Sequence, residues 1–274
     1  MTKTGFTFVL KAGIIWGVIL MVSALCGMLL GLGGPAAPDE GPFNAGQAFL
    51  LVNMLHALVL ATIAMRTTLG GWRLGLLLGA TLFLAQSFLL LIEALYFSGS
   101  VNVPMHEILA GGLISFVSAF GIGLVAALFW RRPGEAGPAG FQARQFLLPV
   151  MGVAALYVLS YFLAGFFIAW AVPDVRAYYG DGVDIELLPL LAFQLFRGSI
   201  WALLALAIVH SLKPGPVATA LTVGMTFSVL AAAQLLYPNP FMPWAVRLPH
   251  LIEVTFSNFL FGAIAGIILQ RRSG

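Results

Sequence analysis

The sequence predicts an all-helical integral membrane protein with eight transmembrane helices, arranged as two parallel four-helix repeats. Three observations lead to this fold class. Of the 274 residues, 61% are hydrophobic and only 8% are charged, whereas a soluble domain carries about 25% charged residues. Eight apolar segments are long enough to cross a bilayer, and polar residues recur at a constant spacing of 141 positions. A chain this apolar would expose large aggregating patches in water, so lipid is its expected solvent.

The eight segments each meet the length that a membrane helix requires. Crossing about 30 Å of hydrocarbon takes roughly 20 helical residues. The predicted helices cover residues 6–32, 46–66, 73–97, 104–130, 145–171, 187–211, 216–236 and 246–270. Their apolar runs are continuous rather than alternating, which favours helices over the strands of a barrel. The first run, about 25 residues, is longer than the core of a cleavable signal peptide, so we expect a retained helix.

Basic residues gather at one set of helix ends and acidic residues at the other. The basic set is Lys3, Lys11, Arg66, Arg73, Arg131, Arg132, Arg144, Lys213, Arg271 and Arg272. The opposite loops carry Asp39, Glu40, Asp174, Asp181, Asp184 and Glu186, with Arg176 as the exception. Because cytoplasmic loops are enriched in Lys and Arg, both termini are expected in the cytoplasm. We expect the location to be a cell membrane, of the prokaryotic inner-membrane type.

The recurring polar residues divide the chain into two similar halves. Adding 141 pairs Asn53 with Gln194, His56 with Arg197, Glu93 with Gln234, and His106 with Arg247. Four helices are an even number, so the halves would insert in the same orientation, related by a pseudo-two-fold axis along the membrane normal. The predicted repeats are residues 1–136 and 141–274, within one membrane domain.

Glycines at four-residue spacing recur along the helices. The pairs and triplets are Gly13 and Gly17, Gly27 and Gly31, Gly71 with Gly75 and Gly79, and Gly262 and Gly266. Such spacing lets helix backbones approach closely in lipid. We therefore expect these glycines to mark packing rather than chemistry.

The last helix carries a polar stripe. Arg247, His250, Glu253 and Ser257 are spaced three, three and four residues apart, which places them on one helical face. Lipid does not tolerate such a stripe, so it should face protein or a water-filled cavity. The sequence predicts a site on this face.

Arg197 is expected near the bilayer midplane, where an arginine costs about 2.5–3.5 kcal/mol on insertion scales. It therefore requires an acidic partner or an anionic ligand. Glu253 is the preferred partner and Glu93 the second. A guanidinium matches carboxylate or phosphate with two parallel hydrogen bonds, which favours an anionic ligand.

The charges differ between the halves, which favours one asymmetric site over two symmetric ones. The predicted ligand-binding residues are Arg197, Glu253, His250, Arg247, Glu93, His56, Asn53, Gln194 and His106. Structural roles compete with this interpretation. Arg247 and His106 lie near helix ends, from which they could extend to the interface, and the amides could serve as hydrogen-bonding links between helices.

Other kinds of site are less well supported. His250 and Glu253 could share a metal ion, but Arg197 and Arg247 would repel a cation, so we predict no metal site. The sequence identifies no catalytic residue and no cofactor. The small net charge of +3, without any Lys/Arg-rich run, argues against nucleic acid as a partner. The single cysteine, Cys26, allows no internal disulfide.

The function that this pattern favours is transport or binding of a small anionic or amphipathic ligand, in an outward-facing polar pocket between the repeats. Two alternatives remain open: a membrane-embedded enzyme acting on a lipid or isoprenoid head group, and a structural or accessory membrane subunit. The absence of hydrolase and metalloprotease motifs inclines the sequence towards a non-enzymatic role. Lipid is the one partner that the sequence identifies.

Overall fold

The structure is a computed structural model of the chain, and it describes residues 3–30, 40–97, 105–130, 143–180, 186–239 and 242–270. Within these residues the ordered structure is helical, apart from one isolated antiparallel bridge between Thr67 and Leu212. Eight helical runs in this part of the chain are long and apolar enough to cross a membrane. The prediction of a multi-pass helical membrane protein is therefore confirmed.

Some residues named above lie outside the described part of the chain. They are Gly31, Asp39, Arg131, Arg132, Asp181, Asp184, Arg271 and Arg272, and the side chains of Lys3, Gly27 and Arg144 are likewise not described.

The chain forms two compact units. The first contains helices α1 to α5 together with Ser211–Lys213, and the second contains residues 40–44 and the remaining helices α6 to α10. Each unit thus includes a short segment from the other half of the sequence. The relation of the halves as parallel four-helix repeats stays a prediction.

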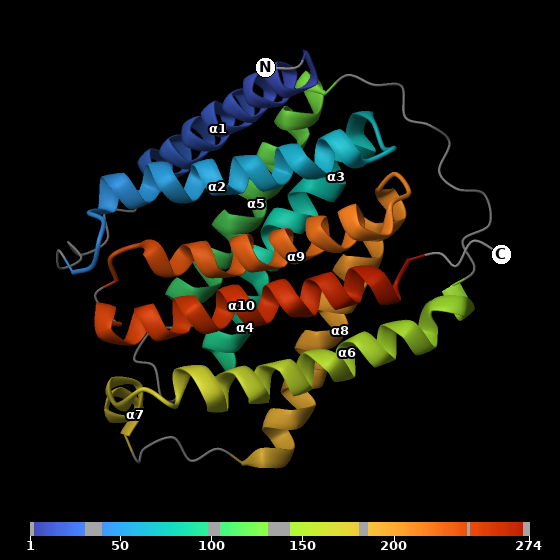
Figure 1. The fold of residues 1–274 in the computed structure, drawn as a ribbon. Coiled ribbons are helices and arrows are strands. Elements are labelled where there is room, and N and C mark those ends of the chain that lie inside the picture. Colours follow the sequence, from blue (N-terminus) through green and yellow to red (C-terminus); the bar gives the residue numbers. More distant parts are fainter. Residues whose placement is uncertain are drawn as a thin grey trace. The chain divides into compact units, whose positions relative to one another are not determined.

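The first unit consists of four long helical runs (Figure 1). These are α1 (Lys3–Leu30), α2 (Ala45–Arg66), the continuous run α3 (Gly71–Leu82), η1 (Phe83–Phe88) and α4 (Leu89–Tyr96), and α5 (Met105–Phe129). Helix α1 packs against α2 and α5, and α3 packs along α5. Residues 211–213 join this unit because the Lys213 N–H donates to the Arg66 carbonyl at 2.8 Å and the Thr68 N–H donates to the Ser211 carbonyl at 2.8 Å.

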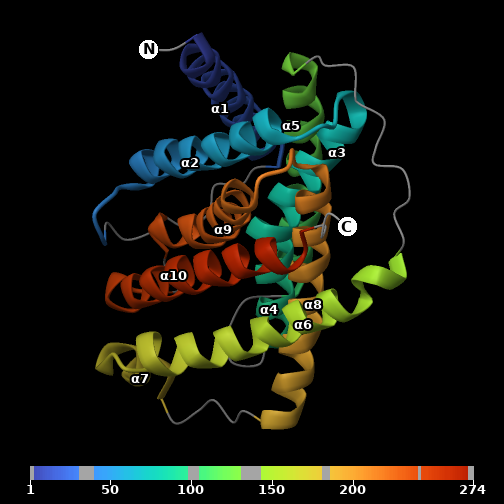
Figure 2. The ribbon, with the colours of Figure 1, turned by 45° about the vertical axis from the view of Figure 1, so that its right-hand side comes forward.

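The second unit also has four long runs, with a short helix added. These are α6 (Ala143–Ala164) continued by η2 (Gly165–Ala169), the short α7 (Pro173–Tyr179), α8 (Leu187–Ser211), α9 (Pro216–Ala232) continued by η4 (Ala233–Leu236), and α10 (Trp244–Ile268). Helices α9 and α10 run side by side in both ribbon views (Figures 1 and 2), and α10 also packs on α6, η2 and α7. Helix α10 is therefore central to this unit.

Three of the predicted spans change their winding along their length. Segments η1 and η2 are π-helical and η4 is a 3₁₀ turn. In η2 the Trp170 N–H donates to the Gly165 carbonyl at 2.9 Å, five residues back, which widens the helix at this point. Single π turns inside α-helices often occur at functional sites.

Glycines bring two helix pairs into close contact. A methyl group at Gly79 would lie 2.9 Å from the Phe120 Cα, and one at Gly262 would lie 2.9 Å from the Val223 carbonyl oxygen. The packing prediction is thus confirmed for α3 with α5 and for α9 with α10. It does not hold for Gly13, Gly17 and Gly71, where no described atom would lie within 4 Å of the added methyl group.

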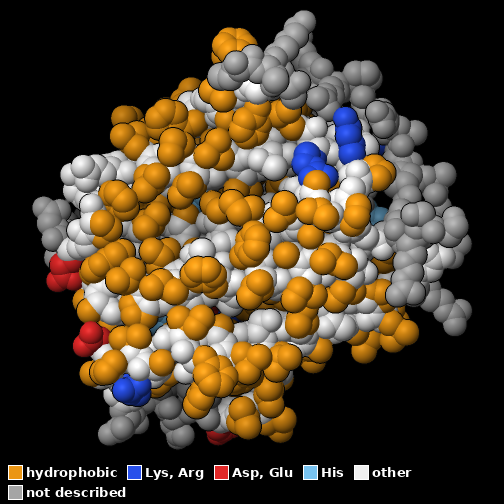
Figure 3. All heavy atoms as spheres, viewed as in Figure 1, with side chains coloured by type: hydrophobic (Ala, Val, Ile, Leu, Met, Phe, Trp, Pro, Cys, Tyr) orange, Lys and Arg blue, Asp and Glu red, His pale blue; other side chains and the backbone are white. Residues whose placement is uncertain are grey.

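Apolar side chains cover the outside of the helices. Figure 3 shows hydrophobic side chains spread over the viewed face, with the visible Lys, Arg, Asp and Glu side chains near its margin. Large side chains such as Phe166, Leu148 and Leu188 are 70%, 78% and 77% exposed. Since water would not tolerate this much exposed hydrocarbon, a lipid bilayer is the environment that this surface fits.

Candidate functional site

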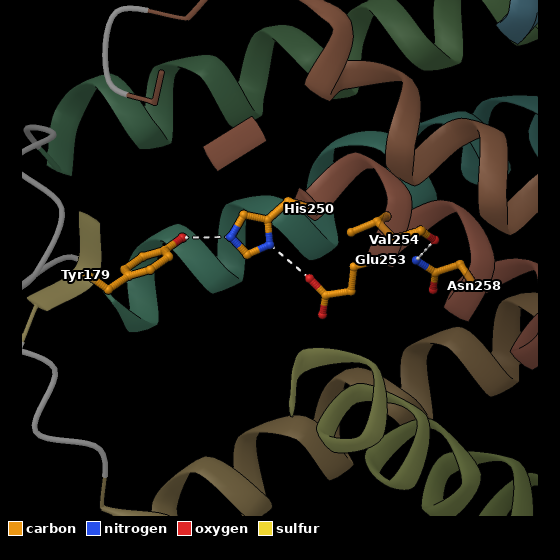
Figure 4. Close-up of polar contacts among 5 residues, drawn as sticks. All are labelled: Tyr179, His250, Glu253, Val254 and Asn258. Carbon is orange, nitrogen blue, oxygen red and sulfur yellow. Dashed lines mark hydrogen bonds and ion pairs between the residues drawn. The ribbon is translucent and has the colours of Figure 1, made fainter. Parts of the chain in front are cut away.

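A hydrogen-bonded chain of three titratable side chains occupies one end of α10 (Figure 4). The Tyr179 hydroxyl lies 3.3 Å from His250 Nε2, and His250 Nδ1 lies 2.9 Å from Glu253 Oε2. The side chains of His250 and Glu253 are 19% and 12% exposed. Both belong to a helix that can span the membrane, so this is a partly accessible ionisable pair within a membrane segment.

The residue spacing on α10 explains the contact between His250 and Glu253. Residues three apart on a helix are neighbours on one face, so the sequence predicted that His250 and Glu253 would lie together. Their contact is confirmed. Tyr179 could not be placed from sequence, because it comes from a different helix.

Helix α7 is what brings Tyr179 to His250. Pro173 at its first turn fixes a helical φ angle, and Gly180 ends it at φ +58°, in the left-handed region that glycine favours. Val175 is fully buried in a small cluster with Ala169 of η2 and Val246 of α10. This anchor holds the Tyr179 ring against His250, with ring centroids 6.0 Å apart.

The widened turn η2 makes room for the Glu253 carboxylate. A methyl group added at Gly165 would lie 3.7 Å from Glu253 Oε1, and the carboxylate points toward α6 in Figure 4. No larger side chain separates Glu253 from the backbone at this position. Gly165 is thus part of the site. Nothing in the sequence distinguished it from the other small residues of the helices.

Arg197 lies within α8 and is 6% exposed. Its Nη1 donates to Gln194 Oε1 at 3.0 Å, and its guanidinium lies 5.8 Å from the Tyr157 ring centroid and 5.7 Å from that of Phe193. The residue one turn earlier on the same helix is thus a hydrogen-bond partner of Arg197. The aromatic faces add a cation–π attraction.

The preferred ion pair between Arg197 and Glu253 is not formed, because the carboxylate bonds to His250 instead. Arg197 contacts α6 at Tyr157, and Glu253 faces the same run at Gly165. These positions are eight residues apart in the sequence, which corresponds to roughly 12 Å along a helix axis. The prediction failed because the sequence gives the depth of a residue in the membrane only approximately. About two helical turns separate Tyr157, which Arg197 contacts, from Gly165, which Glu253 faces.

Arg247 is held by backbone oxygens. Its Nη1 donates to the Tyr237 carbonyl and its Nη2 to the Glu40 carbonyl, the latter at 2.8 Å. The residue is 1% exposed and its guanidinium lies 5.3 Å from the Trp244 ring centroid. The alternative in which Arg247 extends to the membrane interface is wrong, because these contacts turn it inward. Arg247 ties residue 40 and the end of η4 to the start of α10.

The first unit holds the other predicted residues. Asn53 and His56 are buried on α2, and the Asn53 amide donates to the Phe49 carbonyl of its own helix at 2.8 Å. His56 is 1% exposed, and its Nε2 has no hydrogen-bond partner within the described residues. Glu93 is half-buried on α4 and His106 is exposed at the start of α5. Their membership of one site with the residues of the second unit stays a prediction.

An open hollow lies beside the Tyr179 end of the polar chain. Its volume is about 540 Å³, and it is lined by Phe166, Phe167, Trp170, Ala171 and Arg176. None of these was a predicted site residue. Trp170 stacks on Tyr179 with ring centroids 5.7 Å apart, so a single aromatic contact separates the hollow from the Tyr179–His250–Glu253 chain. The predicted outward-facing polar pocket stays a prediction, because this hollow is mainly apolar.

Within the described residues, no group of three or more His, Cys, Asp or Glu side chains is gathered closely enough to hold a metal ion. Comparisons with protein families, with curated proteins and with solved structures gave no match for this chain. Its chemistry must therefore be argued from its own residues.

Proposed function

We propose that this chain binds a small anionic or amphipathic ligand within the membrane, as a step in the transport of that ligand. The observation that carries the proposal is the Tyr179–His250–Glu253 chain, with its carboxylate and imidazole 2.9 Å apart inside a membrane-spanning helix. Ionisable residues at such positions are costly, and they commonly mark ligand or proton pathways.

The chain of three groups is suited to moving charge. With Nδ1 protonated, His250 donates to Glu253, and the Tyr179 hydroxyl donates to Nε2. With both ring nitrogens protonated, His250 is a cation beside a carboxylate, and its Nε2 donates to the Tyr179 oxygen. A ligand that alters the charge next to Glu253 would favour one of these two forms, and the proton that distinguishes them would be exchanged with water or with the ligand.

Arg197 favours an anionic group in the ligand. Its positive charge lies in the middle of α8, and the Gln194 amide and two aromatic rings hold it in place. A guanidinium matches the geometry of carboxylate or phosphate, so Arg197 favours these groups as the anionic part of the ligand. The location of the pocket between two repeats, its opening to the outside and the cytoplasmic termini belong to this proposal as predictions from the sequence.

Thermal unfolding of the purified chain in nonionic detergent tests the proposal. The probes are citrate, glycerol 3-phosphate and lysophosphatidylglycerol, which represent a carboxylate, a phosphate monoester and an anionic amphiphile. At least one should raise the unfolding midpoint saturably, since a ligand at 100 times its Kd stabilises a protein by about 2.7 kcal/mol. Arg197→Gln and Glu253→Gln should lose this response. Arg73→Gln, which removes an exposed charge far along the chain from the site residues, should keep it.

Two results would contradict the proposal. One is the absence of any saturable response in the wild-type chain. The other is an equal response in the wild-type chain and in both site variants. Release of a chemically altered probe would instead favour the enzyme alternative.

A further inference from the structure

We infer that the ligand is an amphiphile with an anionic head group and one hydrocarbon tail, which enters from the lipid through the hollow lined by Phe166, Phe167, Trp170, Ala171 and Arg176. This inference rests on the proposed function, because it names the ligand class of the Tyr179–His250–Glu253 site.

The walls of the hollow fit a hydrocarbon tail. Phe166 and Phe167 are 70% and 68% exposed, so they face the lipid rather than the interior of the unit. The hollow is open and has a volume of about 540 Å³, so a tail lying in it would stay in contact with the lipid. A tail placed there would exchange some lipid contacts for aromatic ones without meeting a polar wall.

Arg176 supplies the charge that complements an anionic head group. It is exposed at the edge of the hollow, and its Nη1 donates to the Trp170 carbonyl at 2.5 Å. This hydrogen bond holds the guanidinium at the Trp170 backbone, beside the hollow. The loops expected on this side of the membrane carry acidic residues, and Arg176 is the basic exception. An anionic head group would therefore be attracted to Arg176.

The hollow also leads to the polar chain. Trp170 forms one wall of the hollow and stacks on Tyr179 at 5.7 Å, while the hydroxyl of Tyr179 bonds to His250. The π-helical turn η2 serves both places, because it exposes Phe166 and Phe167 to lipid and turns Gly165 toward Glu253. The hollow is thus connected to the ionisable pair through the stacked rings of Trp170 and Tyr179.

Equilibrium binding to the purified full chain in nonionic detergent, measured by native mass spectrometry, tests this inference. The probes are lysophosphatidylglycerol, lysophosphatidylcholine with the same tail, and glycerol 3-phosphate without a tail. Lysophosphatidylglycerol should bind about fivefold more tightly than lysophosphatidylcholine, the factor that corresponds to about 1 kcal/mol per basic residue acting on an anionic lipid. Glycerol 3-phosphate should bind at least tenfold more weakly, because it lacks the tail.

Two variants test the charge of Arg176 and the open volume of the hollow separately. Arg176→Gln should bring the affinities for the two lysophospholipids within twofold of each other. Ala171→Trp fills the hollow without changing charge, and it should weaken both lysophospholipids at least fivefold. Ala171 and Arg176 are both exposed, so we expect both variants to fold. Arg73→Gln is the matched control, because Arg73 is an exposed arginine over a tryptophan ring, 5.6 Å from the Trp72 centroid, and does not line this hollow.

The inference is overturned if both variants bind lysophosphatidylglycerol like the wild type, or if glycerol 3-phosphate binds as tightly as the amphiphile. This failure is distinguishable from failure of the proposed function. If probe binding depends on Glu253 and Arg197 but not on Ala171 or Arg176, the proposed ligand site is supported and entry through the hollow is contradicted. If binding depends on Ala171 and Arg176 but not on Glu253, the hollow is a lipid site unconnected with the proposed function.

Discussion

Arg247 directs two of its guanidinium nitrogens at the backbone carbonyls of Tyr237 and Glu40, which lie far apart in the sequence. The Trp244 N–H adds a long bond of 3.4 Å to the Glu40 carboxylate. Each hydrogen bond to a charged group contributes about 1.5–3 kcal/mol to stability. Arg247 therefore stabilises the fold by linking Glu40 and Tyr237 to α10.

This structural role leads to a stability prediction. Arg247→Met should lower the free energy of unfolding by about 2–4 kcal/mol, because it removes the charged donor from two partly buried hydrogen bonds. Denaturation of the purified protein with sodium dodecyl sulfate, followed by circular dichroism, measures the change. Arg73→Met at an exposed position should be nearly neutral. If Arg247→Met unfolds like the wild type and instead abolishes probe binding, Arg247 belongs to the ligand site.

Partners of single residues were only partly predictable. His250 and Glu253 were placed together because a three-residue spacing on a helix fixes their contact. The hydrogen bond between Gln194 and Arg197 joins residues at the same three-residue spacing, although it was not predicted. Tyr179, Gly165 and the carbonyls that hold Arg247 were missed, because their positions depend on how separate helices pack, and no periodicity within one helix records that.

At the scale of elements, glycine sets how closely α9 and α10 approach. Gly262 leaves so little space that a methyl group would lie 2.9 Å from the Val223 carbonyl oxygen. The helices would have to separate to admit a side chain, and forced overpacking typically costs about 1–3 kcal/mol. Packing contacts of this kind replace the hydrophobic effect as the source of helix association in lipid.

Gly262→Val should therefore lower the free energy of unfolding by about 1–3 kcal/mol. Gly13→Val is the matched control, since no described atom would lie within 4 Å of a methyl group there. We expect this control to be neutral or slightly stabilising. Both values come from the same detergent titration, and equal losses for the two variants would contradict the close α9–α10 contact.

The helices themselves were predictable, whereas their irregular parts were not. Hydropathy and length are local properties, so all eight spans could be read from the sequence. The wide turns η1 and η2 carry no proline or charge that would mark them. Helix α7 lies within a stretch assigned to a loop, although Pro173 and Gly180 bound it as helix signals.

At the scale of the whole molecule, polar side chains lie in helices that can span lipid. We propose that these side chains bind a ligand and are not needed for packing. A buried ion pair seldom stabilises a protein more than well-packed apolar residues do. If the pair is functional, replacing both members by leucine should leave the fold intact and remove the response to ligand. If the pair is structural, the same change should weaken the fold.

The measurement that tests this claim most directly is thermal unfolding of the His250→Leu/Glu253→Leu double variant, with and without the probe to which the wild type responds. The account predicts an unfolding midpoint that without probe stays close to that of the wild type, since apolar replacement of a buried pair is often neutral or stabilising, and no increase on adding the probe. A much lower midpoint without probe, or a wild-type increase with it, would contradict the account.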